Sequence, residues 1–160
     1  MIRGPKRVVV LFTAAIVVAG GLAAWAWIAG ARAERAERSG RDALAAATAA
    51  TQAIFSYDYR RFDASVANGT QFVTGPFAQE YAQTTTALKS SAQKEQAVVR
   101  AEVSAAAVVS ASADRVDVLL YVNQYRRNNN ISGEKVDQNR VMLTLVNVDG
   151  SWKVASAAAV

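Results

Sequence analysis

The sequence predicts an α+β protein in which a single N-terminal transmembrane helix is followed by helices packed on a curved antiparallel sheet. Three observations lead to this fold class. Residues 8–31 carry no charged side chain, residues 32–62 contain no proline and place apolar side chains at helical spacing, and the chain beyond about residue 95 alternates as strands do. Helices that precede a run of neighbouring strands are typical of α+β rather than parallel α/β folds.

The composition limits the chemistry that the chain can perform. Its 160 residues include no cysteine and no histidine, which excludes disulfides, thiol nucleophiles, catalytic triads with histidine and zinc sites built from cysteine and histidine. The net charge is +5, from 18 basic and 13 acidic residues, but no basic stripe is interleaved with aromatic side chains. We therefore expect no nucleic-acid partner, no cofactor, no metal site and no enzymatic activity.

Residues 8–31 form the predicted transmembrane helix. A helix of that length spans about 36 Å, which is enough to cross a hydrocarbon core of roughly 30 Å with some tilt. Trp25 and Trp27 lie near its far end, where aromatic rings favour the headgroup layer. A cleavable signal peptide is the main alternative, but the apolar run exceeds the usual length of such a segment. We interpret it as an uncleaved anchor.

The charges that flank the span do not decide its orientation. Three basic residues precede it and four arginines follow, diluted by three acidic residues. The usual layout of a signal anchor predicts a single-pass protein of the plasma membrane, with residues 1–7 as a cytoplasmic tail and an extracytoplasmic, periplasmic domain. Within the span, a face of small residues is a candidate for packing against another membrane helix, although such residues are also simply common in spans. This face consists of Ala15, Ala19, Gly20 and Ala23.

Residues 32–62 are predicted to form the juxtamembrane and first domain helix, and residues 63–160 the remainder of the α+β domain. Asn68-Gly69 is a helix stop, and Thr74-Gly75-Pro76 starts another helix with proline in its first turn. One apolar stripe on the first helix supports this reading; it contains Leu44, Ala47, Thr51, Phe55, Tyr59 and Phe62. The following helix places Phe77, Tyr81, Thr84 and Leu88 on one face.

Strands are predicted for residues 97–113, 115–127 and 139–148. In the second of these, Val116, Val118, Leu120 and Val122 alternate with a more polar set. Asp149-Gly150 is a strong signal for a type I′ hairpin turn. After this turn the chain is expected to form one short strand and then an alanine-rich tail, which gives a sheet of three or four strands.

Several short motifs follow one another along the chain: Ser56-Tyr57-Asp58-Tyr59, Phe62-Asp63, Thr74-Gly75-Pro76-Phe77, Asp137-Gln138-Asn139-Arg140-Val141 and Val148-Asp149-Gly150-Ser151-Trp152. Their order resembles that of the Mce-associated membrane proteins of actinobacteria. That resemblance implies a cystatin-like, nuclear-transport-factor-2-like cone, and an accessory role beside the mammalian-cell-entry (Mce) type lipid transporters of the cell envelope, whose subunits would be its partners. It implies no catalytic residues. The layout is also similar to that of the inner-membrane assembly subunit of type IV secretion systems.

Two groups of polar residues are candidate sites. Asp137, Gln138, Asn139 and Arg140 are a candidate partner-binding cluster, or else a strand entry whose side chains pair locally. Asp58 or Asp63 would be the general base of an enzyme, but the alternative is a structural pairing of Asp58 with Arg61.

The sequence is compatible with three functions. The leading one is a non-enzymatic accessory subunit of an Mce-type lipid import complex in the cell envelope, bound to the lipid bilayer. The alternatives are a membrane-tethered domain that binds a small molecule or acts as an enzyme, and an assembly subunit of a secretion system. A small-molecule domain requires a deep, partly apolar pocket. A closed cone filled by Phe55, Tyr59, Phe62 and Trp152 would exclude it.

Overall fold

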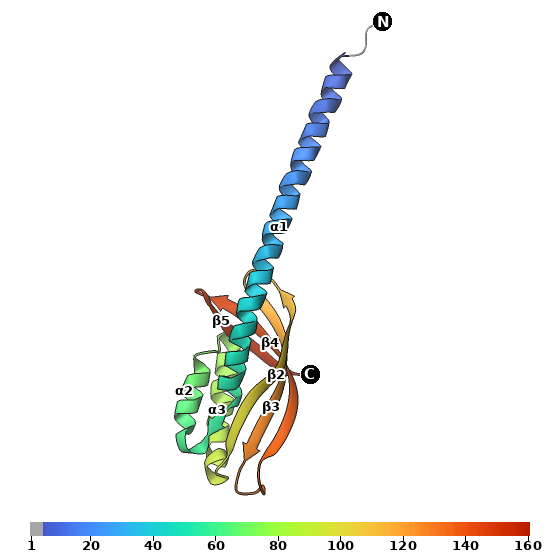
Figure 1. Ribbon diagram of the computed structural model, residues 1–160. Coiled ribbons are helices and arrows are strands. Elements are labelled where there is room, and N and C mark those ends of the chain that lie inside the picture. Colours follow the sequence, from blue (N-terminus) through green and yellow to red (C-terminus); the bar gives the residue numbers. More distant parts are fainter. Residues whose placement is uncertain (1–4) are drawn as a thin grey trace.

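A computed structural model describes residues 5–160 of the chain, and their side chains from Gly20 onward. The helix α1 (Pro5–Phe55) runs without interruption into a domain that contains all the other elements (Figure 1). They follow in the order β1 (Tyr57–Asp58), a 3₁₀ turn (Tyr59–Arg61), α2 (Phe62–Thr70), α3 (Gly75–Lys94), β2 (Val98–Ala111), β3 (Arg115–Arg127), β4 (Lys135–Val148) and β5 (Ser151–Ala159).

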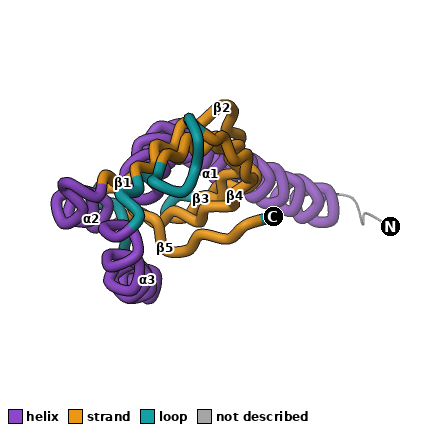
Figure 2. Tube along the Cα trace, turned by 90° about the horizontal axis from the view of Figure 1, so that it is seen from below, coloured by secondary structure: helices purple, strands orange, loops and turns teal. Residues whose placement is uncertain are grey.

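The five strands form one antiparallel sheet in the order of the chain, and the helices cover its inner face. Figure 2 shows the strands curving past α1, with α2 and α3 gathered at one side. This arrangement confirms the predicted α+β class with helices packed on a curved antiparallel sheet. The sheet has five strands rather than three or four, because Tyr57–Asp58 pairs with Val98 and Val99.

The core lies between α1 and the inner face of the sheet. Ala43, Ala47 and Ala50 are buried at helical spacing on α1, and these small side chains let the helix approach the strands closely. The facing strand residues alternate as predicted and are fully buried, at about 1.5–3 kcal/mol for each large aliphatic side chain. They include Val116, Val118, Leu120, Leu143, Leu145 and Val154.

The first helix differs from the prediction at its C-terminal end, because α1 ends at Phe55 and not at Phe62. Ser56 leaves the helix and its Oγ accepts a hydrogen bond from the backbone N–H of Ala101 on β2, at 2.9 Å. This side-chain bond replaces a helical one, and the chain turns to pair with the sheet as β1. Phe62 then starts α2 and belongs to a separate small cluster with Ala92 and Ala97.

The C-terminal alanines also differ from the prediction. Residues 155–159 continue β5 instead of forming a tail, and residues 156–159 pair with residues 141–144 of β4 after a register shift between Thr144 and Leu145. The turn before them is as predicted: Asp149 and Gly150 both have positive φ, at 50° and 83°, which is the signature of a type I′ turn.

The predicted transmembrane segment falls partly outside the described side chains, which begin at Gly20. Within the part of the chain that the structure describes, no helix is apolar over a length sufficient to cross a membrane. The described part of this segment stands clear of the domain (Figure 1), and its large apolar side chains are exposed, Trp25 to 71% and Trp27 to 77%.

Candidate functional site

The inner face of the sheet is not completely filled by the helices. A cavity of about 510 Å³ lies between the end of α1, the first turn of α2, the helix α3 and the strands β2 to β5. Its size is typical of small-molecule sites, which measure roughly 300–1,000 Å³. Phe55 and Phe62 line this cavity, but Tyr59 and Trp152 do not. The cone is therefore not closed in the way that would exclude a small-molecule ligand.

Two apolar walls face each other across the cavity. Phe77, Tyr81 and Leu88 recur at spacings of four and seven along α3, so that they share the helix face that points to the sheet. On the opposite wall, Val122 of β3 and Val141 of β4 lie at inward-facing positions. Thr85 and not Thr84 is the buried threonine of α3, and its Oγ1 bonds back to the carbonyl of Tyr81 at 2.8 Å.

The polar end of the cavity is built where β3 and β4 pair. The Nη2 of Arg126 lies 3.0 Å from the Oδ2 of Asp137, and the Nζ of Lys135 lies 3.4 Å from the Oδ1 of the same carboxylate. In the register of the sheet Arg126 is opposite Lys135, so its pair with Asp137 is diagonal. The Nε of Arg126 is buried and has no hydrogen-bond partner among the described residues.

Tyr57 adds a hydroxyl group to this end of the cavity. It belongs to β1, lines the cavity and packs edge-on against Phe62 with ring centroids 5.5 Å apart. Burial raises the pKa of Tyr57, the positive charge of Arg126 opposes that rise, and Glu95 adds to it. A tyrosine hydroxyl of ordinary pKa is protonated at neutral pH, and the raised pKa keeps it so, which leaves the hydroxyl able to donate a hydrogen bond.

The run Asp137-Gln138-Asn139-Arg140 lies inside β4, two residues beyond its start at Lys135. Alternation along the strand divides the run between the two faces of the sheet. Asp137 and Asn139 line the cavity, where Asn139 donates to the Oε1 of Gln124 at 3.0 Å. Gln138 and Arg140 line a hollow on the outer face, beside Tyr121. The structure therefore does not bring the four side chains to one surface.

The other predicted site residues have local structural roles. The Oδ1 of Asp58 accepts the backbone N–H of Arg60 at 2.9 Å and so caps the 3₁₀ turn. The carboxylate of Asp63 pairs with Lys89 of α3 at 2.7 Å. Neither carboxylate lines the cavity. Among the described contacts, the expected pairing of Asp58 with Arg61 does not occur, because the cap engages Asp58 instead.

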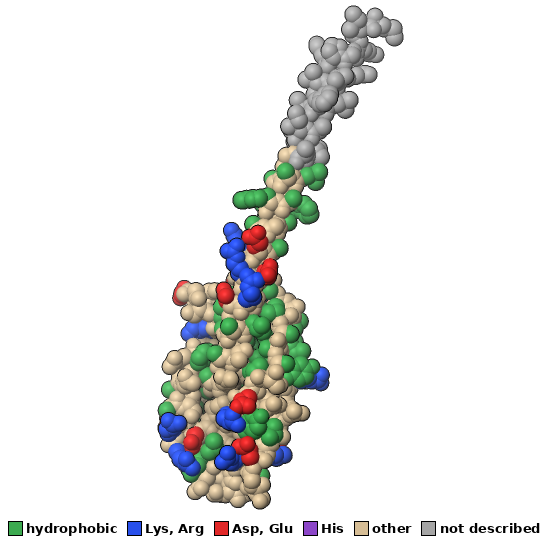
Figure 3. Space-filling model, viewed as in Figure 1, with side chains coloured by type: hydrophobic (Ala, Val, Ile, Leu, Met, Phe, Trp, Pro, Cys, Tyr) green, Lys and Arg blue, Asp and Glu red, His purple; other side chains and the backbone are tan. Residues whose placement is uncertain are grey.

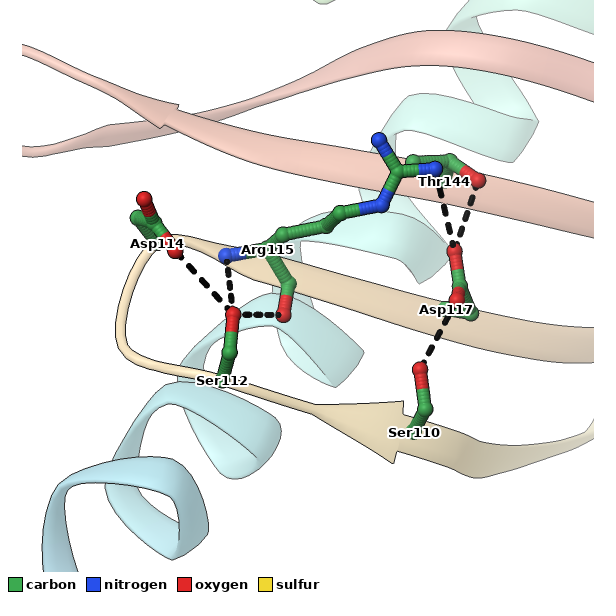
Figure 4. A network of polar contacts seen from close by, with 6 residues as sticks. All are labelled: Ser110, Ser112, Asp114, Arg115, Asp117 and Thr144. Carbon is green, nitrogen blue, oxygen red and sulfur yellow. Dashed lines mark hydrogen bonds and ion pairs between the residues drawn. The ribbon is translucent and has the colours of Figure 1, made fainter. Parts of the chain in front are cut away.

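A second polar network holds the outer face of the sheet (Figure 4). Asp117 accepts hydrogen bonds from Thr144 and Ser110, each at 2.7 Å. Both bonds lower the pKa of Asp117, and the bond from Thr144 has the larger effect. The more distant Arg115 lowers this pKa further. The carboxylate joins three neighbouring strands, because Ser110, Asp117 and Thr144 belong to β2, β3 and β4. Its oxygens are engaged by hydrogen bonds, so it is a structural group.

The membrane-packing face and a metal site are the remaining candidates. Of the predicted membrane-packing face, Gly20 and Ala23 are exposed, while Ala15 and Ala19 lie outside the residues whose side chains are described. Within residues 20–160, no three aspartate or glutamate side chains converge as metal ligands would.

Sequence reasoning missed Arg126 and Tyr57 as cavity residues. Arg126 ends a predicted strand where polar side chains were expected, and only the register of β3 against β4 shows that it points inward next to Asp137. The sequence predicts Tyr57 on the first helix, whereas α1 ends at Phe55 and Tyr57 reaches the cavity from the strand β1.

Comparisons with known proteins find likeness in structure alone. No family model and no curated protein matches the sequence. Among solved structures, an IcmL-like type IV secretion system protein from Legionella pneumophila matches with a TM-score of 0.61 at 16% identity, over 73% of this chain and 88% of that one. The VirB8 protein of Agrobacterium tumefaciens matches with a TM-score of 0.59 at 13% identity, over 72% and 88%. The periplasmic domain of DotI matches with a TM-score of 0.56 at 16% identity, over 73% and 91%.

These findings overturn the resemblance to Mce-associated membrane proteins. Several solved structures that share the fold are type IV secretion proteins, which contradicts the predicted role in lipid import and the Mce-type transporter subunits as partners. The motifs that suggested them have a simpler explanation. The Asp-Gln-Asn-Arg run is an alternating strand segment, and Asp149-Gly150 is the turn that a tight antiparallel hairpin requires. Both mark the fold and not a particular family.

Proposed function

We propose that this chain is a membrane-anchored, non-enzymatic assembly subunit of a type IV secretion-like machine, with its α+β domain outside the cytoplasmic membrane. The observation that carries the proposal is the shared fold, which covers most of this chain and about nine-tenths of each matching type IV secretion domain. The match with a periplasmic domain of DotI supports an extracytoplasmic position for residues 63–160.

The first helix supports the anchor. Leu22, Trp25 and Trp27 are more than half exposed on a stretch of α1 that stands clear of the domain. Exposed large apolar side chains at neighbouring positions mark contact with a membrane or with another protein. Figure 3 shows hydrophobic side chains on this stretch of α1, and charged side chains between it and the domain. A bilayer around residues 8–31 would cover the hydrophobic side chains. It would leave the charged side chains in water, among them the pairs Arg38–Glu34 and Arg41–Glu37.

The polar groups of the domain support a role without catalysis. Asp58 caps a turn and Asp63 pairs with a lysine, while Asp117 is held by two hydroxyl groups. A general base needs a free lone pair directed at a substrate proton. These carboxylates instead stabilise the fold, which suits a subunit that acts by binding other subunits.

Affinity purification of the tagged full-length chain from membranes in mild detergent tests this function. We expect other envelope secretion subunits to copurify and to be identified by mass spectrometry. A matched control carries residues 1–41 fused to an unrelated folded domain, which keeps the anchor but removes the α+β domain. Companions that are retained by the full chain and lost by the control support the proposal. Recovery of the full chain alone, or of the same companions with the control, contradicts it.

A further inference from the structure

We propose that the cavity between α3 and the sheet binds an amphiphilic monocarboxylate, with its apolar body between the two apolar walls and its carboxylate on Arg126 and Tyr57. This goes beyond the proposed function, which makes no use of the cavity. It rests on the shape of the cavity, on an unpartnered buried donor and on the balance of charges around that donor.

The apolar body fits the greater part of the lining. Phe62, Phe77 and Leu88 come from the helices, and Val99, Val122 and Val141 come from the strands. Most of these side chains are buried in the fold, yet a cavity of about 510 Å³ remains between them. When an apolar group displaces water from the apolar surface of such a cavity, the free energy of binding is favourable.

The head group is fixed by the donors at the polar end. Nε and Nη2 lie on the same edge of the Arg126 guanidinium, and Nη2 is engaged by Asp137 at 3.0 Å. The second oxygen of Asp137 faces Lys135 instead of completing a two-point contact with Arg126. The Nε–H is therefore buried without an acceptor among the described residues. The Arg126 side chain as a whole is 39% exposed, and an unsatisfied donor favours a small turn of the guanidinium that presents the Nε–H to a ligand with the missing acceptor.

The local charges favour a single negative charge on that acceptor. Arg126 and Lys135 share one carboxylate, that of Asp137, so these three groups together carry a net charge of +1. The negative charge of Glu95 also acts on Tyr57, but Glu95 lies outside the cavity lining and accepts a hydrogen bond from Asn128 at 3.1 Å. Glu80 also borders the cavity, but it lies on the exposed side of α3, where solvent screens its charge. The Tyr57 hydroxyl supplies a second donor. Two donors and one excess positive charge match the two oxygens of a carboxylate, whereas a phosphate group would call for more cations.

Photolabelling of the full-length chain in phosphatidylcholine nanodiscs tests the proposal. The probe is decanoic acid with a diazirine in its chain, compared with the equivalent decane, which has no head group. We expect the acid to label peptides that contain Phe62–Val66 and Phe77–Leu88, and unlabelled decanoic acid to compete. Both probes will label the membrane part of α1, so the comparison concerns the domain peptides. Equal labelling of those peptides by acid and hydrocarbon, or labelling confined to α1, overturns the proposal.

Two pairs of variants locate the site. R126Q is expected to reduce labelling of the domain peptides by the acid about tenfold, as expected for loss of a charge-assisted hydrogen bond. R127Q removes the neighbouring arginine, which pairs with Glu134 away from the cavity, and should leave the labelling unchanged. T84F places a ring at the exposed rim of the cavity and should prevent the probe from entering. Q83F adds the same ring at the preceding position, which lies outside the lining, and should leave the labelling unchanged.

The second pair keeps the test decisive if R126Q does not fold, because Thr84 is exposed and its replacement leaves the core intact. Equal labelling of T84F and Q83F, or of folded R126Q and R127Q, contradicts the proposal. Neither result bears on the copurification experiment, so the proposed function stands or falls separately.

Discussion

The hydroxyl of Tyr81 occupies the space that any side chain on Gly69 would need. A Cβ added to Gly69 would overlap that hydroxyl and would stand 2.8 Å from the Tyr81 Cζ and 3.0 Å from the carbonyl oxygen of Ala53. Gly69, Tyr81 and Ala53 belong to α2, α3 and α1, so Gly69 lies where these three helices meet. Close approach of backbones is a common reason for glycine inside a helix.

We therefore predict that Gly69→Ala destabilises the domain by about 1–3 kcal/mol, the usual cost of overpacking. Denaturant unfolding of the full-length chain in detergent measures the change. Asn68→Ala, at the exposed neighbouring position of α2, is the matched control and should change the stability by less than about 0.5 kcal/mol. Tyr81→Phe removes the overlapping oxygen and should recover part of the loss in the double variant. A Gly69→Ala protein as stable as the control would show that the helices do not meet as described.

Leu143 tests the packing of the sheet against α1. Its side chain is fully buried on the inner face of β4, and Leu143→Ala should cost about 2–5 kcal/mol through lost burial and the cavity left behind. Leu119→Ala is a matched deletion on β3, at a position that is only half-buried because it faces outward. Thermal unfolding of the two variants should show the larger decrease in Tm for Leu143→Ala. A larger decrease in Tm for Leu119→Ala would show that the core lies on the other face of the sheet.

Asp117 makes the stability of the sheet depend on pH in a defined direction. Its hydrogen bonds to Thr144 and Ser110 lower its pKa in the folded state. The contribution of its carboxylate is therefore complete above the unfolded-state pKa of about 3.9 and disappears as the pH falls through the lower folded-state pKa. We expect Asp117→Asn to lower the free energy of unfolding by about 1 kcal/mol at pH 7, and the difference from the native chain to vanish in strong acid.

Unfolding curves recorded between pH 7 and about pH 2 follow this change through the acid range in which such carboxylates titrate. Asp63→Asn is the control, because that carboxylate is 78% exposed and its pair with Lys89 lies on the surface. A constant difference between Asp117→Asn and the native chain across this pH range would rule out the described role of the carboxylate.

The turn between β4 and β5 requires glycine at position 150. Gly150 has φ of 83°, a conformation that costs an L-residue with a side chain about 1–2 kcal/mol. Gly150→Ala should destabilise the domain by that amount, whereas Ser151→Ala, at the exposed start of β5, should have little effect. Equal stability of the two variants, measured by denaturant unfolding, would mean that the hairpin uses another turn.

Local patterns predicted much of the fold. The alternation from Val116 to Val122 placed the buried face of β3 correctly, since a period of two leaves one choice of face once one set is apolar. The turn at Asp149-Gly150 and the start of α3 after Thr74 follow equally from backbone chemistry within a few residues. Each of these features is decided by near neighbours in the chain.

The features that were missed depend on distant partners. Ser56 ends α1 because its hydroxyl bonds to Ala101, which lies 45 residues away, and the alanines of β5 become a strand because β4 offers them a free edge. The candidate site is of the same kind, since Arg126 and Asp137 meet only through the register of two strands. The assignment to a family was wrong because its motifs report sheet geometry, which unrelated sequences share.

The proposed function depends most on an anchored helix that holds the domain outside the cytoplasmic membrane. The chain has no cysteine, so Ser132→Cys, in the exposed connection between β3 and β4, provides a unique thiol. Its reaction with a membrane-impermeant maleimide is measured in cells whose outer layer alone has been permeabilised, with Ile2→Cys as the control for the cytoplasmic side. We expect Ser132→Cys to react while the inner membrane is intact, and Ile2→Cys to react only after that membrane is opened. The opposite pattern, or recovery of the chain in the aqueous fraction, would contradict this position of the domain.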